Sequence, residues 1–240
     1  MDSGEYDFKK WKQEKIDKGE WLPYKDYLET KGKRKRDRSD EGENFRTEKT
    51  GCYSPKRELI FDTETTGLSS EDKIVEISLI ETIEGIKTGR SFHCFLNPEV
   101  KISKKAVKIH RLTNEKLSNY PTFKQISKKL IDFIGDSTLV AHNANFDMKM
   151  LNNEFRRIEL PCYGGERFID TLRMARFLFP GQKNRQDDLC ERFGIDNSVR
   201  VGTGIHSAKE DTVHLYFIFK KMGEMLRDKN KDVYNFLVKN

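Results

Sequence analysis

Residues 59–67 read Leu-Ile-Phe-Asp-Thr-Glu-Thr-Thr-Gly, and the rest of the chain is arranged around this stretch. Its first three residues are apolar and have the length of a fully buried strand. Side chains two residues apart in a strand point to the same face, so Asp62 and Glu64 place two carboxylates side by side. No Lys or Arg lies beside them, and the two anions therefore repel each other unless a proton or a cation sits between them.

Two interpretations of these carboxylates are open at this point. In the first, they bind a divalent metal, because carboxylate oxygens suit Mg²⁺ or Mn²⁺ and commonly share Mg²⁺ with substrate phosphate. In the second, Asp62, Thr63 and Thr65 only cap a turn before Gly67. The stretch by itself supports both interpretations equally.

The composition sets limits on the class of protein. The chain has 240 residues, enough for one domain of ordinary size with appendages. Its formal net charge of +6 is compatible with a polyanionic partner. No apolar run approaches the roughly 20 residues that a membrane span needs, and the acidic, polar start lacks the order of a secretion signal. We therefore expect a cytoplasmic protein without a membrane partner.

Changes in composition and hydrophobic pattern divide the chain into four parts. Residues 1–30 carry aromatic side chains among charges at helical spacing, which predicts a short amphipathic helical extension. Residues 31–56 begin with the basic run Lys31 to Arg38 and continue as a polar tract, which predicts a disordered linker able to contact phosphate or to act as a localisation signal. Residues 57–226 have the texture of a packed α/β domain, and residues 227–240 are expected to form a short C-terminal tail.

Within the expected domain, the pattern predicts a mixed sheet flanked by helices. Residues 73–81 and 89–96 read as two more strands, joined to the first by short Gly-containing turns, which favours an antiparallel meander. An apolar stripe predicts a helix over residues 123–134, and residues 137–141 return as a short central strand. The order strand-helix-strand makes the sheet mixed and the fold class α/β.

A third carboxylate follows this central strand. Asp147 ends the segment 142–147, His-Asn-Ala-Asn-Phe-Asp, and shares one helix face with Leu151 and Phe155. Taken singly, an acid in a first helical turn is usually only a partner of the helix dipole. Its place between a strand end and a helix start is also where open α/β sheets bind ligands.

The last helix begins with a fourth carboxylate. Asp211 starts the buried stripe of this helix, which continues at spacings of three and four through Leu215, Ile218, Met222 and Met225. His206 stands before it, after a Gly-rich approach over residues 202–205. A histidine before a helix is usually structural or exposed, whereas one this close to a metal-binding acid is a candidate general base.

Together these motifs resemble those of the DEDDh family of 3′–5′ exonucleases. The matching motifs are Asp62-x-Glu64, the segment 142–147 with its Asp147, and His206-x4-Asp211. Within that family, the chain more closely resembles the proofreading epsilon subunits of bacterial DNA polymerase III, through further matches at residues 109–113, 170–172, 178–182 and 193–198. The resemblance covers roughly residues 57–226 and implies an RNase H-like fold.

The resemblance also implies a cofactor of two Mg²⁺ or Mn²⁺ ions and a role for each motif residue. Asp62, Glu64 and Asp211 would bind the first ion, with Asp62 bridging to the second, and Asp147 would help to hold the second. His206 would take the proton from the attacking water, while the ions stabilise the attacking and leaving oxygens of an in-line displacement at phosphorus. The positions that match those holding the terminal nucleotide are Thr65, Ala106, Ile109, His110, His142 and Phe146.

The implied reaction releases nucleoside 5′-monophosphates from the 3′ end of single-stranded DNA, with a DNA polymerase subunit as a second expected partner. Three departures from the epsilon pattern weigh against that second partner. A long segment precedes the first strand, the chain stops soon after its last helix, and Arg111 replaces the small residue that usually follows the family's histidine. A stand-alone exonuclease, or one recruited through its N-terminus, is therefore an equal alternative.

Two other functions compete with this interpretation. An RNA-trimming 3′–5′ exoribonuclease of the same superfamily would share the motifs, and the sequence offers no clean test for the ribose. A non-catalytic nucleic-acid-binding or polymerase-tethering module is the other. Such a module would not need every site residue, so the presence of all of them argues against it.

Overall fold

The computed structural model describes residues 56–238, nearly all of them in a compact unit that begins at Arg57. The helical extension expected over residues 1–30 and the linker expected over residues 31–56 fall outside the described residues, apart from Lys56. Within the described range, no helix combines the length and the apolar composition needed to cross a membrane.

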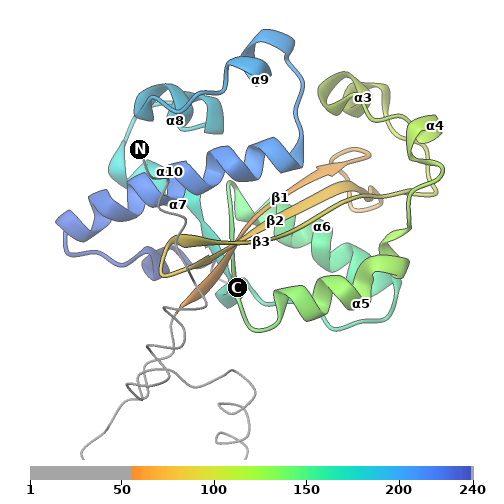
Figure 1. Cartoon of the computed structure of the whole chain (residues 1–240), viewed down its shortest axis with the longest axis horizontal. Helices are drawn as coiled ribbons and strands as arrows, with labels where there is room; N and C mark the ends of the chain where they lie inside the picture. Colours follow the sequence, from red (N-terminus) through yellow and green to blue (C-terminus); the bar gives the residue numbers. More distant parts are fainter. Residues whose placement is uncertain (1–55, 239–240) are drawn as a thin grey trace, which may run out of the picture. The chain divides into compact units, whose positions relative to one another are not determined.

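A five-stranded mixed sheet forms the centre of this unit (Figure 1). Its spatial order is β3-β2-β1-β4-β5. β1 pairs antiparallel with β2, and β2 with β3, whereas β4 runs parallel to both β1 and β5. The predicted meander and the predicted mixed sheet are therefore confirmed. The strands are β1 (Arg57–Thr65), β2 (Ile74–Ile83), β3 (Ile86–Phe95), β4 (Thr138–Ala141) and β5 (Phe168–Asp170).

Helices cover both faces of the sheet (Figure 1). One face packs against α5 and α6 through a core that includes Leu59 and Phe61, and the other packs against α7, α8 and α10 through a core that includes Ile60. The helical segments are α3 (Lys104–His110), α4 (Asn114–Leu117), α5 (Phe123–Ile134), α6 (Ala144–Arg157), η1 (Gly165–Arg167), α7 (Thr171–Leu178), α8 (Gln186–Phe193), α9 (Ser198–Thr203), α10 (Ala208–Asp228) and η2 (Val233–Phe236).

β1 lies in the middle of the sheet, and its sequence explains that place. Leu59, Ile60 and Phe61 are each 0% exposed, because alternate side chains of the strand enter the cores on opposite faces of the sheet. Asp62 and Glu64 continue the face of Ile60, which is the face that α10 covers. The apolar run thus determines the direction in which the two carboxylates point.

Three features differ from the expectations drawn from the sequence. β5 has only three residues, too few for a periodic pattern to reveal. The Gly-rich approach to the last helix overlaps α9, which ends at Gly204 in the left-handed conformation that glycine adopts easily (φ 64°). The tail expected from residue 227 is instead part of the folded unit, because α10 continues to Asp228 and the apolar side chains of Phe236 and Val238 are buried in the two cores.

Candidate active site

An open cavity of about 480 Å³ lies at the C-terminal end of β1, and most of the predicted acids meet there. Asp62 and Glu64 line it from β1, Asp211 lines it from the first turn of α10, and His206 lines it from the segment before that helix. The fold therefore brings together residues that are far apart in the sequence. The other lining residues are Thr63, His142, Asn143, Leu172, Arg176, Arg185, Gln186 and Arg200.

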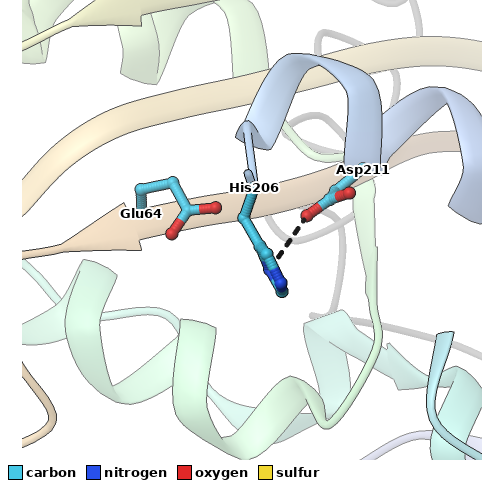
Figure 2. Close-up of side chains that lie close together, drawn as sticks. All are labelled: Glu64, His206 and Asp211. Carbon is cyan, nitrogen blue, oxygen red and sulfur yellow. Dashed lines mark ion pairs between the residues drawn. The ribbon is translucent and has the colours of Figure 1, made fainter. Parts of the chain in front are cut away.

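Glu64, His206 and Asp211 form a group of candidate metal ligands in this cavity. One ligand atom from each lies within 4.8 Å of those of the other two. Figure 2 shows His206 between the two carboxylates, and its Nδ1 is 3.8 Å from Asp211 Oδ2. This spacing is small enough for one divalent cation to contact both carboxylates while the imidazole stays beside it.

The electrostatics of the two β1 carboxylates favour a bound cation. Burial raises the pKa of Asp62 well above its usual range, and the charges of Asp147, Asp211 and Glu64 raise it further. Burial also raises the pKa of Glu64 to about 8, with added repulsion from Asp211 and Glu76. Each carboxylate keeps part of its surface toward the cavity, although protein surrounds it on the other sides. Hard oxygen donors that repel one another in this way suit Mg²⁺ or Mn²⁺.

Asp147 lies beside this group without lining the cavity. Its α6 position places it against β1 from the other side, where Thr63 Oγ1 donates a hydrogen bond to its Oδ1 at 2.8 Å. Burial raises its pKa to about 7, although the Thr63 hydrogen bond lowers it. Among the neighbouring charges, that of Asp147 has the largest effect on the pKa of Asp62. Asp147 is therefore coupled to the cavity through Asp62.

His206 has the protonation state that a base requires. Burial lowers its pKa, and the nearby charge of Arg200 lowers it further, while Asp211 acts in the opposite direction. An imidazole whose pKa lies below its usual range is neutral at pH 7 and can accept a proton.

Two of the predicted substrate-binding histidines are held by backbone and hydroxyl groups. His110 is buried, with Nε2 3.2 Å from the Thr65 carbonyl oxygen. His142 lines the cavity, with Nδ1 2.9 Å from Thr171 Oγ1 and Nε2 2.9 Å from the Asn184 carbonyl oxygen. Burial lowers the pKa of both rings. Both rings are therefore neutral at pH 7 and fixed in orientation.

The other predicted substrate-binding residues lie at different depths. Thr65 and Ala106 are buried, and Phe146 is half-buried against the core below β1. Ile109 is 45% exposed, and its carbonyl oxygen accepts a hydrogen bond from the His206 backbone N–H at 3.0 Å. Of the six predicted positions, only His142 lines the cavity itself, while Ile109 places α3 directly beside the segment that carries His206.

Arg200 is a cavity residue that the sequence did not reveal. Its buried guanidinium donates through Nη1 to Asp211 Oδ1, and its Nε lies 2.9 Å from Asp187 Oδ1. Its positive charge opposes the rise in the pKa values of Asp62 and Glu64. The pairing joins α9 to α10 across a turn, and no periodic pattern connects residues in two different helices.

Glu76 is a second residue that the sequence-based prediction missed. It is 1% exposed on β2, and its carboxylate accepts hydrogen bonds from Ser207 Oγ at 3.0 Å and the Ala208 backbone N–H at 3.1 Å. His93 Nε2 lies 2.8 Å from the same carboxylate. Glu76 therefore fixes the start of α10, directly after His206. An acid in the middle of an apolar strand needs a buried partner, and that was the available signal.

A family of known proteins and several curated relatives match the chain. The family model described as "Exonuclease" matches residues 59–219. DNA polymerase III subunit epsilon of Rickettsia typhi is 40% identical over 197 residues, which cover 78% of this chain and 85% of that protein. The subunit of the same name from Haemophilus influenzae is 35% identical over 177 residues, which cover 70% of this chain and 68% of that protein.

Solved structures of exonucleases share the fold. Exonuclease X, in complex with 5′-overhanging duplex DNA, has 25% sequence identity and a TM-score of 0.58, covering 75% of this chain and 97% of that one. Escherichia coli exonuclease I, in complex with a dT13 oligonucleotide, has 18% identity and a TM-score of 0.60, covering 72% of this chain and 43% of that one. The likeness to exonuclease I concerns the fold alone.

The matched region contains every residue of the predicted catalytic set. Asp62, Glu64, Asp147, His206 and Asp211 all lie within residues 59–219. The family generally depends on divalent metal, and the acidic group around Glu64 has suitable donors for one. The chain belongs to this exonuclease family and is a 3′–5′ exonuclease similar to the epsilon subunits of DNA polymerase III.

Proposed function

We propose that the protein removes nucleotides from the 3′ end of single-stranded DNA and releases nucleoside 5′-monophosphates, as a proofreading subunit does. The observation that carries this proposal is the convergence of Asp62, Glu64 and Asp211 with His206 around one cavity. Hydrolysis of a phosphodiester needs charge stabilisation at phosphorus and a base for the attacking water. The cavity offers acids that could hold the cations needed for the first requirement, and a neutral imidazole for the second.

The acids fit two Mg²⁺ or Mn²⁺ ions. Asp62, Glu64 and Asp211 would hold the first ion, Asp62 would be shared with the second, and Asp147 would support the second from its place behind β1. The repulsion that raises the pKa values of Asp62 and Glu64 would then be replaced by attraction to the cations. Bound ions would stabilise charge on the attacking and leaving oxygens of an in-line displacement.

His206 acts as the general base in this proposal. Its Nδ1 faces Asp211 Oδ2, which leaves Nε2 as the atom that takes the proton from water. The imidazolium that forms lies beside the Asp211 carboxylate, whose negative charge stabilises it. Glu76 and Ile109 hold the segment around His206 in place through the hydrogen bonds to Ser207, Ala208 and the His206 backbone.

DNA is the favoured substrate because the names of the relatives refer to DNA. The curated relatives are epsilon subunits of DNA polymerase III, and exonuclease X is in complex with DNA. A polymerase subunit is accordingly a proposed partner, and proofreading is the proposed role.

The proposed function is tested with single strands of DNA and RNA of the same sequence, labelled at the 5′ end. With Mg²⁺ or Mn²⁺ we expect successive shortening from the 3′ end, faster on DNA, with mononucleotides carrying a 5′-phosphate as products. Chelator should abolish shortening, and Glu64→Gln, which keeps the side-chain volume, should be inactive. Faster shortening of RNA would favour the exoribonuclease. Binding of DNA without any shortening in either metal would favour the non-catalytic module.

A further inference from the structure

Four cations lie together on the outer side of α3 and define what we call the α3 basic surface: Lys104, Lys105, Lys108 and Arg111. All four are exposed. They surround an open hollow of about 550 Å³ whose floor is formed by Ile102 and Val107. Within the part of the chain that the structure describes, no acidic group lies within ion-pair distance of any of the four. Their charge is therefore available to an external anion.

This surface adjoins the active site. The Ser103 backbone N–H, at the start of α3, donates to the Thr66 carbonyl oxygen just after β1, at 3.0 Å. Near the end of α3, the Ile109 carbonyl oxygen accepts from the His206 backbone N–H. Figure 1 shows α3 near the tip of β1. Asp62 and Glu64 belong to the last four residues of that strand. The helix that carries the α3 basic surface is therefore hydrogen-bonded to both the segment after β1 and the segment that carries His206.

The chemistry of the hollow matches single-stranded DNA. Proteins that follow single strands line a groove with cations that contact the backbone phosphates, and many add aromatic side chains on which bases stack. The α3 basic surface offers the cations, placed around the apolar side chains of Ile102 and Val107. A duplex groove reader would instead need an element that enters a groove, whereas this surface is a shallow hollow beside a short helix.

We propose that the α3 basic surface binds the phosphates of single-stranded DNA upstream of the 3′ nucleotide that is removed. This inference rests on the proposed function, because it assigns a place to the rest of the same strand. Each phosphate contact releases counterions, so binding through this surface must weaken with salt. The surface would contribute most to strands long enough to extend beyond the catalytic cavity.

Two of the lysines of this surface do not stabilise their own helix, whereas Lys108 lies in its last turn, where positive charge is favourable. Lys104 and Lys105 occupy the first turn of α3, where the helix dipole disfavours positive charge and where α3 has no acidic residue. Replacing all three lysines with glutamine removes two unfavourable charges and one favourable charge, so the melting temperature should stay close to that of the wild type. A change in DNA binding in such a variant cannot then be attributed to lost folding.

The test compares two triple variants of the full chain that remove the same charge. The first is Lys104→Gln/Lys105→Gln/Lys108→Gln. The second, the matched control, is Lys124→Gln/Lys128→Gln/Lys129→Gln on α5, which has one lysine in its first turn where α3 has two, and which packs against the sheet face away from α10. Binding of a fluorescent single strand longer than roughly 16 nucleotides is measured in chelator across a salt series. Turnover with Mg²⁺ is measured on the same strand and on a dinucleotide.

The expected result is specific to α3. The slope of the logarithm of the binding constant against the logarithm of the salt concentration should fall by about 2 in the α3 variant, roughly 0.7 for each lost contact, and should stay as in the wild type in the control. The ratio of kcat/KM on the long strand to that on the dinucleotide should fall only in the α3 variant. Equal slopes in the two variants would overturn the inference. A wild type that binds the strand but never shortens it would overturn the proposed function instead.

Discussion

The two ends of one face of β1 carry buried acids of different kinds. Glu58, near the start of the strand, is 4% exposed, and its carboxylate accepts hydrogen bonds from Tyr234 Oη at 2.9 Å and Thr82 Oγ1 at 3.1 Å. Asp62 and Glu64, at the other end, face further carboxylates instead. Burial raises the pKa of Glu58 to about 7, close to the value of about 8 for Glu64.

A raised pKa therefore does not by itself identify a metal site. At Glu58 the hydrogen-bond donors are two neutral hydroxyl groups and the backbone N–H of Gly85, which satisfy the carboxyl group without requiring any further ligand. One anion, Glu84, also raises the pKa of Glu58, but its effect is smaller than that of burial and of the two hydroxyl groups. At Glu64 the neighbours are anions from other elements, and only protons, Arg200 or an added cation can offset their charge. The two sites differ in the charge of the neighbouring groups, which are mainly neutral donors at Glu58 and mainly anions at Glu64. The following predictions test this difference, from the largest expected effect to the smallest.

The largest effect is expected from removing an acid of the cavity. Asp62→Ala or Glu64→Ala should lower the exonuclease rate by several orders of magnitude, because charge stabilisation at phosphorus is lost with the metal ligands. Without metal, the melting temperature should stay level or rise, because repulsion among the remaining acids is relieved. Rates are measured on labelled single strands and melting by calorimetry in chelator. Wild-type rates that persist in chelator would exclude the metal-dependent account.

The raised pKa of Glu64 sets the direction in which the stability of the metal-free protein changes with pH. The folded protein keeps a proton on this group up to a pH of about 8, whereas the unfolded chain releases it near 4.5. Folded protein thus holds more protons in this window, and the stability of the metal-free wild type falls as pH rises through it. Glu64→Ala should lose part of that fall. An unchanged slope in this variant would contradict the assignment of the raised pKa to Glu64.

The next largest effect is expected at His206. His206→Ala should lower turnover by roughly 10²–10⁴-fold, the usual contribution of a positioned base. Metal binding, measured by calorimetry, should be largely kept because Asp62, Glu64 and Asp211 remain. Burial lowers the pKa of His206, so the midpoint of the acid limb in the wild-type pH–rate profile should lie below 6.5, the ordinary pKa of histidine. The acid limb should flatten in the variant. Lost stability and an unchanged acid limb would instead make His206 a structural residue.

The sequence predicted the parts of this site that lie on regular elements. β1 could be predicted because its apolar run is typical of a strand that is covered on both faces. The two acids that follow are two residues apart, which places both on one face. Asp147 and Asp211 were readable because each begins the apolar stripe of a helix, in α6 and α10. Their roles as metal ligands remain predictions, whereas their placement on these elements is a structural fact.

What the sequence did not predict depends on contacts between distant elements. Glu76 reaches Ser207 across 131 positions, and Arg200 reaches Asp211 from a separate helix, so no local pattern reports either pairing. β5 is too short to have a period, and the burial of Phe236 depends on a core that other segments form. Substrate positions such as Ala106 came from the resemblance alone, and the fold places this residue on the buried face of α3 rather than in the cavity.

A moderate effect is expected from Glu76, which repels Glu64 but whose own carboxylate is held by hydrogen bonds at the start of α10. Glu76→Gln keeps the shape but replaces a charged acceptor of several hydrogen bonds, each worth about 1.5–3 kcal/mol when the partner is charged. Displacement of the turn that carries His206 should lower kcat by about 10–100-fold with little change in KM. Ser207→Ala is the matched control, since it removes one of these bonds and should have a smaller effect. Equal kcat values for Glu76→Gln and the wild type would show that this carboxylate does not position His206.

The smallest effect is expected at Glu58, where the comparison between the two ends of β1 is sharpest. Glu58→Gln should change the exonuclease rate by less than about twofold, because this group is paired with Tyr234 and Thr82 far from the cavity. Its raised pKa makes wild-type stability fall as pH rises from 4.5 to about 7, so the variant should show a flatter profile there. Glu64→Gln should likewise flatten the pH profile of stability between 4.5 and about 8. Only Glu64→Gln, however, should reduce the rise in melting temperature that Mn²⁺ produces, because Mn²⁺ binding stabilises only the folded site. If Glu58→Gln reduced that rise equally, burial alone would account for both acids, and the sign of their surroundings would not distinguish a metal site from a structural one.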